Sequence, residues 1–159
     1  MAADGYFLEL DGIPGESQDA RHRDEIELES FGWAETHAAG PGGGAAAGKV
    51  AIHDLHFRAR VSNASPLLLL ACASGRHLKQ ATLTARKAGA AQQDYFVVTL
   101  SDVLVSAYAV AGAEGDLAPV DQVSLSFARI ELEYRPQKPD GSLGAPVKAG
   151  WDVKANKAL

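Results

Sequence analysis

The chain is short of the residues that mark several large classes of protein. Its 159 residues include a single cysteine, Cys72, so no internal disulfide can form, and we expect folding in a reducing compartment. The net charge is −5, and the sequence contains no run of lysine or arginine. Nucleic acids and anionic membrane surfaces both bind basic patches, so the composition argues against either as the main partner.

Long hydrophobic segments are also missing. The longest apolar cluster, residues 67–73, is far too short to span a bilayer, so we expect no membrane insertion. The N-terminus has no basic region and no apolar stretch of signal-peptide length. We therefore expect synthesis in the cytoplasm and, if the protein leaves the cell, export without a cleaved signal peptide.

The length of the chain, 159 residues, is that of one domain. A domain of this size buries roughly 70% of the surface that its unfolded chain exposes, so it needs no disulfide to hold a core. We therefore expect a single domain over residues 1–159.

Most of the sequence has the two-residue alternation of β-strands, with strands predicted near residues 6–10, 26–33, 50–61, 80–87, 95–110, 123–134 and 150–156. The apolar positions change parity between Leu100 and Val103, and again between Phe127 and Ile130. A change of face requires a bulge or a corner. We therefore expect a mainly β fold, a compact β-barrel of two packed antiparallel sheets.

One short α-helix is predicted to begin at Ser65. Its side chain can cap the free backbone N–H groups. Pro66 suits the first helical position, because a backbone N–H there would have no partner within the helix and proline has none. Residues 67–73 are apolar on nearly all sides, which is typical of a helix covered on both faces. Gly75 can adopt the left-handed conformation that ends a helix.

A long extended loop is predicted over residues 36–48, which are almost wholly glycine and alanine. Such a segment cannot bury enough surface to form core. Within it, Gly43, Gly48 and Lys49 nearly match a phosphate-binding loop, which requires a Ser or Thr next and then a helix. Val50 and a strand follow instead, so nucleotide binding is not predicted.

Residues that could carry chemistry form no recognisable site. His53 and His56 are three positions apart on a strand and point to opposite faces, which hinders chelation of one metal ion. Cys72 has small apolar neighbours, whereas a nucleophilic cysteine needs a basic, partly exposed setting. Trp33 and Trp151 could stack on a ligand but more often fill a core or an interface. We predict no enzyme, no catalytic residue, no cofactor and no metal.

Two further groups of titratable residues are interpreted as ordinary surface. Nothing singles out an acid–base pair among the carboxylates near the N-terminus, and the other histidines are scattered. These residues are Asp4, Asp11, Asp19, Asp24 and Glu25, together with His22, His37 and His77.

Several short motifs follow one another in a fixed order. They are residues 11–17 (DGIPGES), 48–50 (GKV), 65–67 (SPL), 86–89 (RKAG), 124–128 (SLSFA) and 150–157 (GWDVKANK). Each is weak alone, but their order and spacing together resemble the Hcp family, the haemolysin-coregulated proteins that form the inner tube of bacterial type VI secretion systems.

The resemblance implies a compact β-barrel with one helix at its side, which assembles as homohexameric rings that stack into a tube. The implied partners are a VgrG-like spike, a contractile sheath with its baseplate, and effector proteins in the lumen. Assembly would take place in the cytoplasm, with export to the extracellular space or a target cell.

The same resemblance places contacts between subunits or rings at the long loop, at the hairpin near residues 86–89 and at the closing strand. The residues are Thr36, His37, Pro41, Gly42, Gly43, Gly48, Lys49, Lys87, Gly89, Trp151 and Lys154. Two other classes stay open: a small-ligand-binding β-barrel, which predicts a monomer with an apolar pocket, and an enzyme, which would need a titratable cluster.

Overall fold

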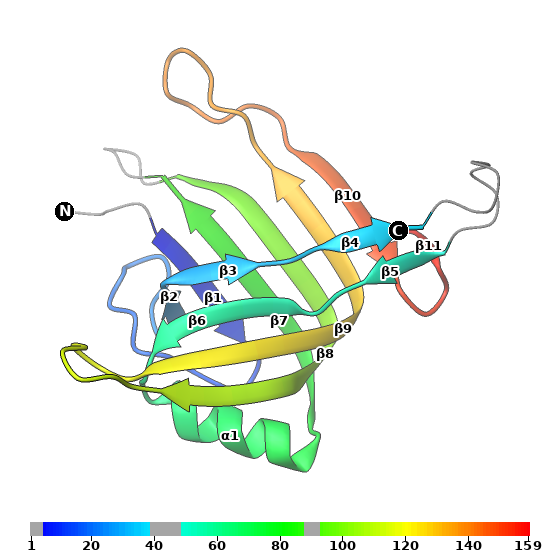
Figure 1. Ribbon diagram of the computed structural model, residues 1–159. Helices are drawn as coiled ribbons and strands as arrows, with labels where there is room; N and C mark the ends of the chain where they lie inside the picture. Colours follow the sequence, from blue (N-terminus) through cyan, green and yellow to red (C-terminus); the bar gives the residue numbers. More distant parts are fainter. Residues whose placement is uncertain (1–4, 39–48, 88–92) are drawn as a thin grey trace.

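The structure is a computed structural model that describes residues 5–38, 49–87 and 93–159 (Figure 1). No helix within these ranges is long and apolar enough to cross a membrane. The elements there, in chain order, are β1 (Gly5–Leu10), β2 (Ile26–Leu28), β3 (Ser30–Gly32), β4 (Glu35–His37), β5 (Val50–Ile52), β6 (Leu55–Arg60), α1 (Ala64–Ser74), β7 (His77–Arg86), β8 (Asp94–Ala111), β9 (Val120–Tyr134), β10 (Val147–Asp152) and β11 (Lys157–Ala158).

Two long strands, β8 and β9, are shared between two antiparallel sheets. The first part of β8, residues 94–104, pairs with β7, which continues to β1 and β2. The first part of β9, residues 120–125, pairs with β6, which continues to β3. The second part of β9, residues 129–134, pairs with β10. The predicted mainly β fold with packed antiparallel sheets is therefore confirmed.

The sheets meet at one edge without closing a barrel. The ladder of described strands runs β2-β1-β7-β8-β9-β6-β3, and the two strands at its ends, β2 and β3, follow each other in the chain. Only Glu29 separates them, and its N–H donates to the Arg58 carbonyl on β6 over 2.8 Å. In the described part of the chain β2 and β3 do not pair with each other, so the ladder stays open at this corner.

The predicted change of face in β8 lies at a corner between the sheets. Leu100 and Val103 are both buried although they are three positions apart, and Asp102 between them has a φ of 54°. A positive φ is uncommon for a residue other than glycine. A register shift between Val105 and Ala107 bends the strand again. The parity pattern therefore located this corner correctly.

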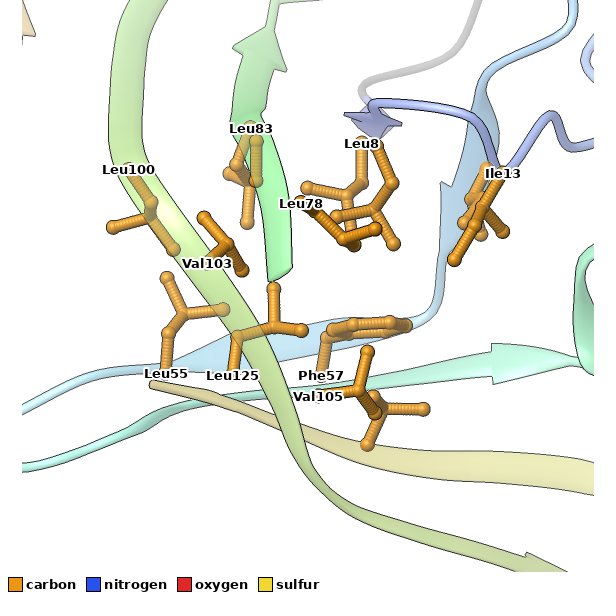
Figure 2. Packing of buried hydrophobic residues seen from close by; sticks show 14 of the residues in the cluster. Leu8, Ile13, Leu55, Phe57, Leu78, Leu83, Leu100, Val103, Val105 and Leu125 are labelled. Atoms are coloured by element: carbon orange, nitrogen blue, oxygen red, sulfur yellow. The ribbon is translucent and has the colours of Figure 1, made fainter. Parts of the chain in front are cut away.

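Side chains from both sheets fill the space between them (Figure 2). Leu8, Leu83 and Leu100 come from β1, β7 and β8, and they share the interior with Phe57 of β6 and Leu125 of β9; none of the five is more than 2% exposed. Burial of each such side chain contributes about 1.5–3 kcal/mol. The interior is therefore a packed core.

The helix α1 begins differently from the prediction. Asn63 stands at the N-cap position and makes no side-chain cap, whereas Ser65 lies in the first turn. The Ser65 hydroxyl donates to Asp121 Oδ2 over 2.5 Å and accepts from the Ser62 N–H over 3.0 Å. The predicted cap is wrong because the helix begins at Ala64, so Ser65 already lies inside it, where its hydroxyl binds this buried carboxylate. Gly75, with φ 66° and ψ 26°, ends the helix as predicted.

Only one side of α1 is covered within the chain. Ala64, Leu68 and Ala71 are each 1% exposed and lie on one helical face, whereas Leu69 and Leu70 are 55% and 58% exposed. The spacing of the buried residues is that of a helix with one face on a core. Within the described residues, the predicted cover is therefore present on one face of the helix and absent from the other.

The first motif, residues 11–17, is explained by a closely packed loop. Gly15 N–H donates to the Asp24 carbonyl over 2.8 Å, and Asp24 N–H donates to the Ser17 carbonyl over 2.9 Å. Ile13 and Ser17 are each 1% exposed. A Cβ atom on Gly15 would lie 2.5 Å from the Glu25 carbonyl oxygen, so only glycine fits.

The predicted long loop starts later than expected. Thr36 and His37 belong to β4 and pair with Ala51 and Val50 of β5. The strand predicted over residues 50–61 is accordingly divided into β5 and β6, at the point where the chain changes pairing partner. The strand predicted over 150–156 is wrong beyond Asp152, because residues 153–156 form a turn that leads from β10 to its partner β11. Residues 39–48 lie outside the described ranges.

The packing at Gly15 generates a prediction about stability. Gly15→Ala places a methyl group against backbone atoms that cannot rotate away, so it should lower the free energy of unfolding by about 1–3 kcal/mol or more. Chemical denaturation followed by circular dichroism measures the change. Gly32→Ala is the matched control, because a Cβ atom there meets nothing within 4 Å. Equal stability of the two variants would contradict this account of the motif.

Candidate functional site

The base of the predicted loop is a two-stranded ribbon formed by β4 and β5. Thr36, His37 and Lys49 are all exposed there. Trp33 joins the two strands at the base of the ribbon, because its Nε1–H donates to the His53 carbonyl over 2.9 Å, and its ring packs against the core. The ribbon therefore brings His37 and Val50, which flank the range outside the described residues, opposite each other. Of the predicted contact residues, Pro41, Gly42, Gly43, Gly48 and Gly89 lie outside the described ranges.

Lys87 and Lys154 lie at opposite ends of the sheet. Lys87 follows the end of β7, and its Nζ lies 4.9 Å from the centroid of the Tyr95 ring, within the range of a cation–π contact. Lys154 follows β10 beyond Asp152, which pairs with Arg129. Several rows of paired residues separate the two lysines along the sheet.

The turn that presents Lys154 is held by Asp152. Its Oδ1 accepts from the Ala155 N–H over 2.8 Å, and its Oδ2 accepts from Arg129 Nε over 3.1 Å. These two donors hold the pKa of Asp152 below its ordinary value, the backbone N–H having the larger effect. The nearby Trp151 is partly covered within the chain and packs against the core.

The uncovered side of α1 is the second notable surface. Leu67, Leu69 and Leu70 are 36%, 55% and 58% exposed, and the helix contains no charged residue. Beneath it, Asp121 fixes the helix to the sheets: the carboxylate is 1% exposed and accepts from Ser65 and from the Tyr108 hydroxyl, the latter over 2.7 Å. Burial, and then the contact with this carboxylate, raise the pKa of Tyr108.

A cluster of titratable residues forms at the base of the β7–β8 hairpin, although three of its members were predicted to be ordinary surface. His22 is 5% exposed; its Nδ1 lies 3.0 Å from Glu25 Oε2 and its Nε2 lies 3.0 Å from Asp94 Oδ1. Asp19 in the same loop pairs with Arg86, which is 4% exposed. The spacing of three residues between Asp19, His22 and Glu25 was the available signal. Asp94 is 72 positions from His22, beyond any local pattern.

One pair has the composition of a nucleophile and a base. His56 Nδ1 lies 2.7 Å from Ser124 Oγ on the exposed outer face of β6 and β9. Asp54 accepts from Ser106 over 2.6 Å, so it does not orient the His56 ring as the third group of a triad does. Cys72 is half-buried and packs against the core.

Sites for ligands are shallow in the part of the chain that the structure describes. No group of three or more His, Cys, Asp or Glu residues there is placed to hold a metal ion. Two hollows of about 380 and 420 Å³ are open, one beside β2 and the end of β6, near Glu27 and Arg60, and one beside Phe31 and His56. A small-ligand barrel would instead use the interior, which the core fills.

Comparisons with known proteins give the family. A family model described as "Type VI secretion system effector, Hcp" matches residues 7–134. Over 162 aligned positions the chain is 40% identical to Protein hcp1 of Pseudomonas aeruginosa, with 98% of each covered. Its structure is similar to the crystal structure of Hcp1 from Salmonella typhimurium, with a TM-score of 0.82, 36% identity and coverage of 99% of this chain and 100% of that one.

A second solved structure, described as that of a type six secretion system protein, has a TM-score of 0.93 at 24% identity. It covers 99% of this chain and 100% of its own, and it shows the same fold. Both the family model and the relative from Pseudomonas aeruginosa span most of the chain, including the closely packed motif at residues 11–17. The chain therefore belongs to the Hcp family of type VI secretion system tube and effector proteins, a structural family rather than a family of enzymes.

Proposed function

We propose that this protein assembles into homohexameric rings that stack into the inner tube of its secretion system. The observation that carries the proposal is the uncovered side of α1, where Leu69 and Leu70 are more than half exposed. An uncharged leucine surface of this kind is stabilised when a neighbouring subunit removes it from water.

A ring of identical chains requires a heterologous contact, in which one surface of a chain meets a different surface of the next. We assign the outer side of α1 to one half of this contact. Asp121 supports the assignment because it fixes the helix against β8 and β9 through buried hydrogen bonds. In a helix held in this way the backbone is already ordered, so binding has only the leucine side chains left to order.

Stacking requires a second contact that repeats along the ring axis. Lys87 and Lys154 suit it because they lie at opposite ends of the sheet, and Trp151 borders the turn that presents Lys154. The β4–β5 ribbon, with Thr36, His37 and Lys49, carries the segment that contains Pro41, Gly42, Gly43 and Gly48. We assign this segment, together with the hairpin of Gly89, to contacts between rings.

The remaining partners follow from the role of a tube. We assign a VgrG-like spike to one end, a contractile sheath and baseplate to the outside, and effector proteins to the lumen. We assign assembly to the cytoplasm and export to the machine itself. Membership of a family of secretion-system effectors supports this route.

The oligomeric state is the first test. Light scattering behind a sizing column should give a mass of about 100 kDa, that of six 16.7-kDa chains. Leu70→Lys should shift the mass to that of the monomer because it places a charge in the subunit contact, while an exposed position leaves the fold stable within about 0.5 kcal/mol. Leu70→Met, which keeps the surface apolar, is the control and should remain hexameric. A Leu70→Lys protein that stays hexameric on dilution would overturn the assignment of α1.

The loop is tested by deleting residues 41–47. The deletion leaves a connection long enough to join β4 to β5, so the fold and the single ring should persist. Stacking should weaken, as measured by sedimentation of assembled rings and by electron microscopy of tubes. Replacing residues 41–47 with glycine and serine at equal length separates the effect of sequence from that of length. Tubes of unchanged length and number after the deletion would contradict the proposed inter-ring role.

A further inference from the structure

His22 has a geometry that favours one state of protonation while both neighbouring carboxylates are ionised. Its two ring nitrogens each lie 3.0 Å from a carboxylate oxygen, of Glu25 on one side and Asp94 on the other. An ionised carboxylate can only accept hydrogen bonds, whereas a neutral imidazole donates from one nitrogen alone. Both contacts are therefore satisfied together when His22 is the doubly protonated imidazolium.

The strands packed around this histidine supply an aromatic ring and a cation. The Phe7 ring of β1 stacks on the imidazole, with centroids 4.4 Å apart and planes 9° from parallel. The Arg86 guanidinium of β7 lies 4.8 Å from the centroid of the same Phe7 ring and pairs with Asp19 of the loop.

Further carboxylates face the cluster from the loop, β8 and β1. Glu25 and Asp94 contact the imidazole directly, and Glu9 acts on Glu25 at longer range. When His22 loses its proton, Arg86 is the one cation left among the groups named here to balance the carboxylates. Such an imbalance in a site of low exposure is costly.

The cluster connects segments that are far apart in the sequence. Residues 19–25 supply Asp19, His22 and Glu25, and the ends of β7 and β8 supply Arg86 and Asp94, which pair with each other. Lys87 follows at once and its N–H donates to the Gln93 carbonyl over 3.2 Å, closing the base of the hairpin. The hydrogen bond from His22 to Asp94 therefore ties the N-terminal loop to this hairpin.

We propose that His22 is a proton-controlled latch, which holds residues 17–25 against the base of the β7–β8 hairpin while protonated and releases them when it loses its proton. Because the hairpin is assigned to contacts between rings, release would also weaken stacking. That second step rests on the proposed function, whereas the latch itself does not.

The direction of the pH dependence follows from the surroundings. Burial acts to lower the pKa of His22, but the hydrogen bonds to Asp94 and Glu25 and the charges of both carboxylates together outweigh it, so the pKa lies above its ordinary value. Stability from a raised histidine pKa is complete below about pH 6.5 and is lost as the pH rises through the folded-state value. Burial also raises the pKa of Glu25. Its contribution to stability therefore also falls as the pH rises, but over a more acidic range than that of His22.

The latch is tested by nuclear magnetic resonance on the whole chain between pH 5 and 9. The His22 ring nitrogens should both carry protons at pH 6, and the protection factors of the His22, Asp24 and Glu25 amides should fall as the ring deprotonates. These amides donate hydrogen bonds within the loop. A neutral His22 ring at pH 6, or amide protection that does not change while the ring titrates, would overturn the proposal.

A matched pair of variants separates the latch from general titration. His22→Gln should fold but show low amide protection in residues 17–25 at every pH. His77→Gln is the control, because His77 is exposed and pairs only with Asp102 over 2.9 Å, and it should keep the pH dependence of the wild type. If His22→Gln keeps full protection or keeps the same pH dependence, His22 is not the latch.

The consequence for assembly is measured by sedimentation of stacked rings at pH 6 and pH 8. The ring–ring association constant should be lower at pH 8, by up to about tenfold for each pH unit when one proton is coupled. Equal stacking at both values, with a latch that titrates as described, would remove the link to assembly. A chain that forms no rings at any pH would refute the proposed function. Amide exchange would then be the test of the latch, which does not depend on ring assembly.

Discussion

The rest of the structure depends on the sharing of β8 and β9 between two sheets. Each strand pairs with one set of neighbours along one half and with another set along the other half. The bend at Asp102 therefore has to place both interior faces on the same core. This requirement explains why Leu100 and Val103 are both buried, and why small shifts of register are confined to the corner and the strand ends.

Buried polar groups attach the peripheral segments to this frame. Asp121 holds α1 through Ser65 and Tyr108, and the pairs of His22 and Arg86 hold the loop that precedes β2. An apolar core is tolerant of small displacements, whereas hydrogen bonds specify one position. The proposed contact surfaces lie beside these anchors, so assembly would use segments whose placement is already fixed.

The sequence allowed the fold to be predicted where the pattern was local. Alternation and its change of parity located the strands and the corner at Asp102, and Gly75 ended the helix as expected. The prediction failed where a distant group decided the outcome. Ser65 lies inside the first turn of α1, and its hydroxyl donates to Asp121, 56 positions away, a contact that no local pattern indicates. The contacts of Asp94 with His22 could not be predicted for the same reason, and the ring contacts depend on other chains.

The same shared strands limit what the chain can do during synthesis. Leu55 of β6 pairs with Leu125, and Gly5 of β1 pairs with Arg86, so the partners of early strands are made much later. Neither sheet can be completed on the ribosome until β9 has emerged. Until then α1 lacks the Asp121 carboxylate that anchors it, and the leucines on both of its sides remain open to other nascent chains.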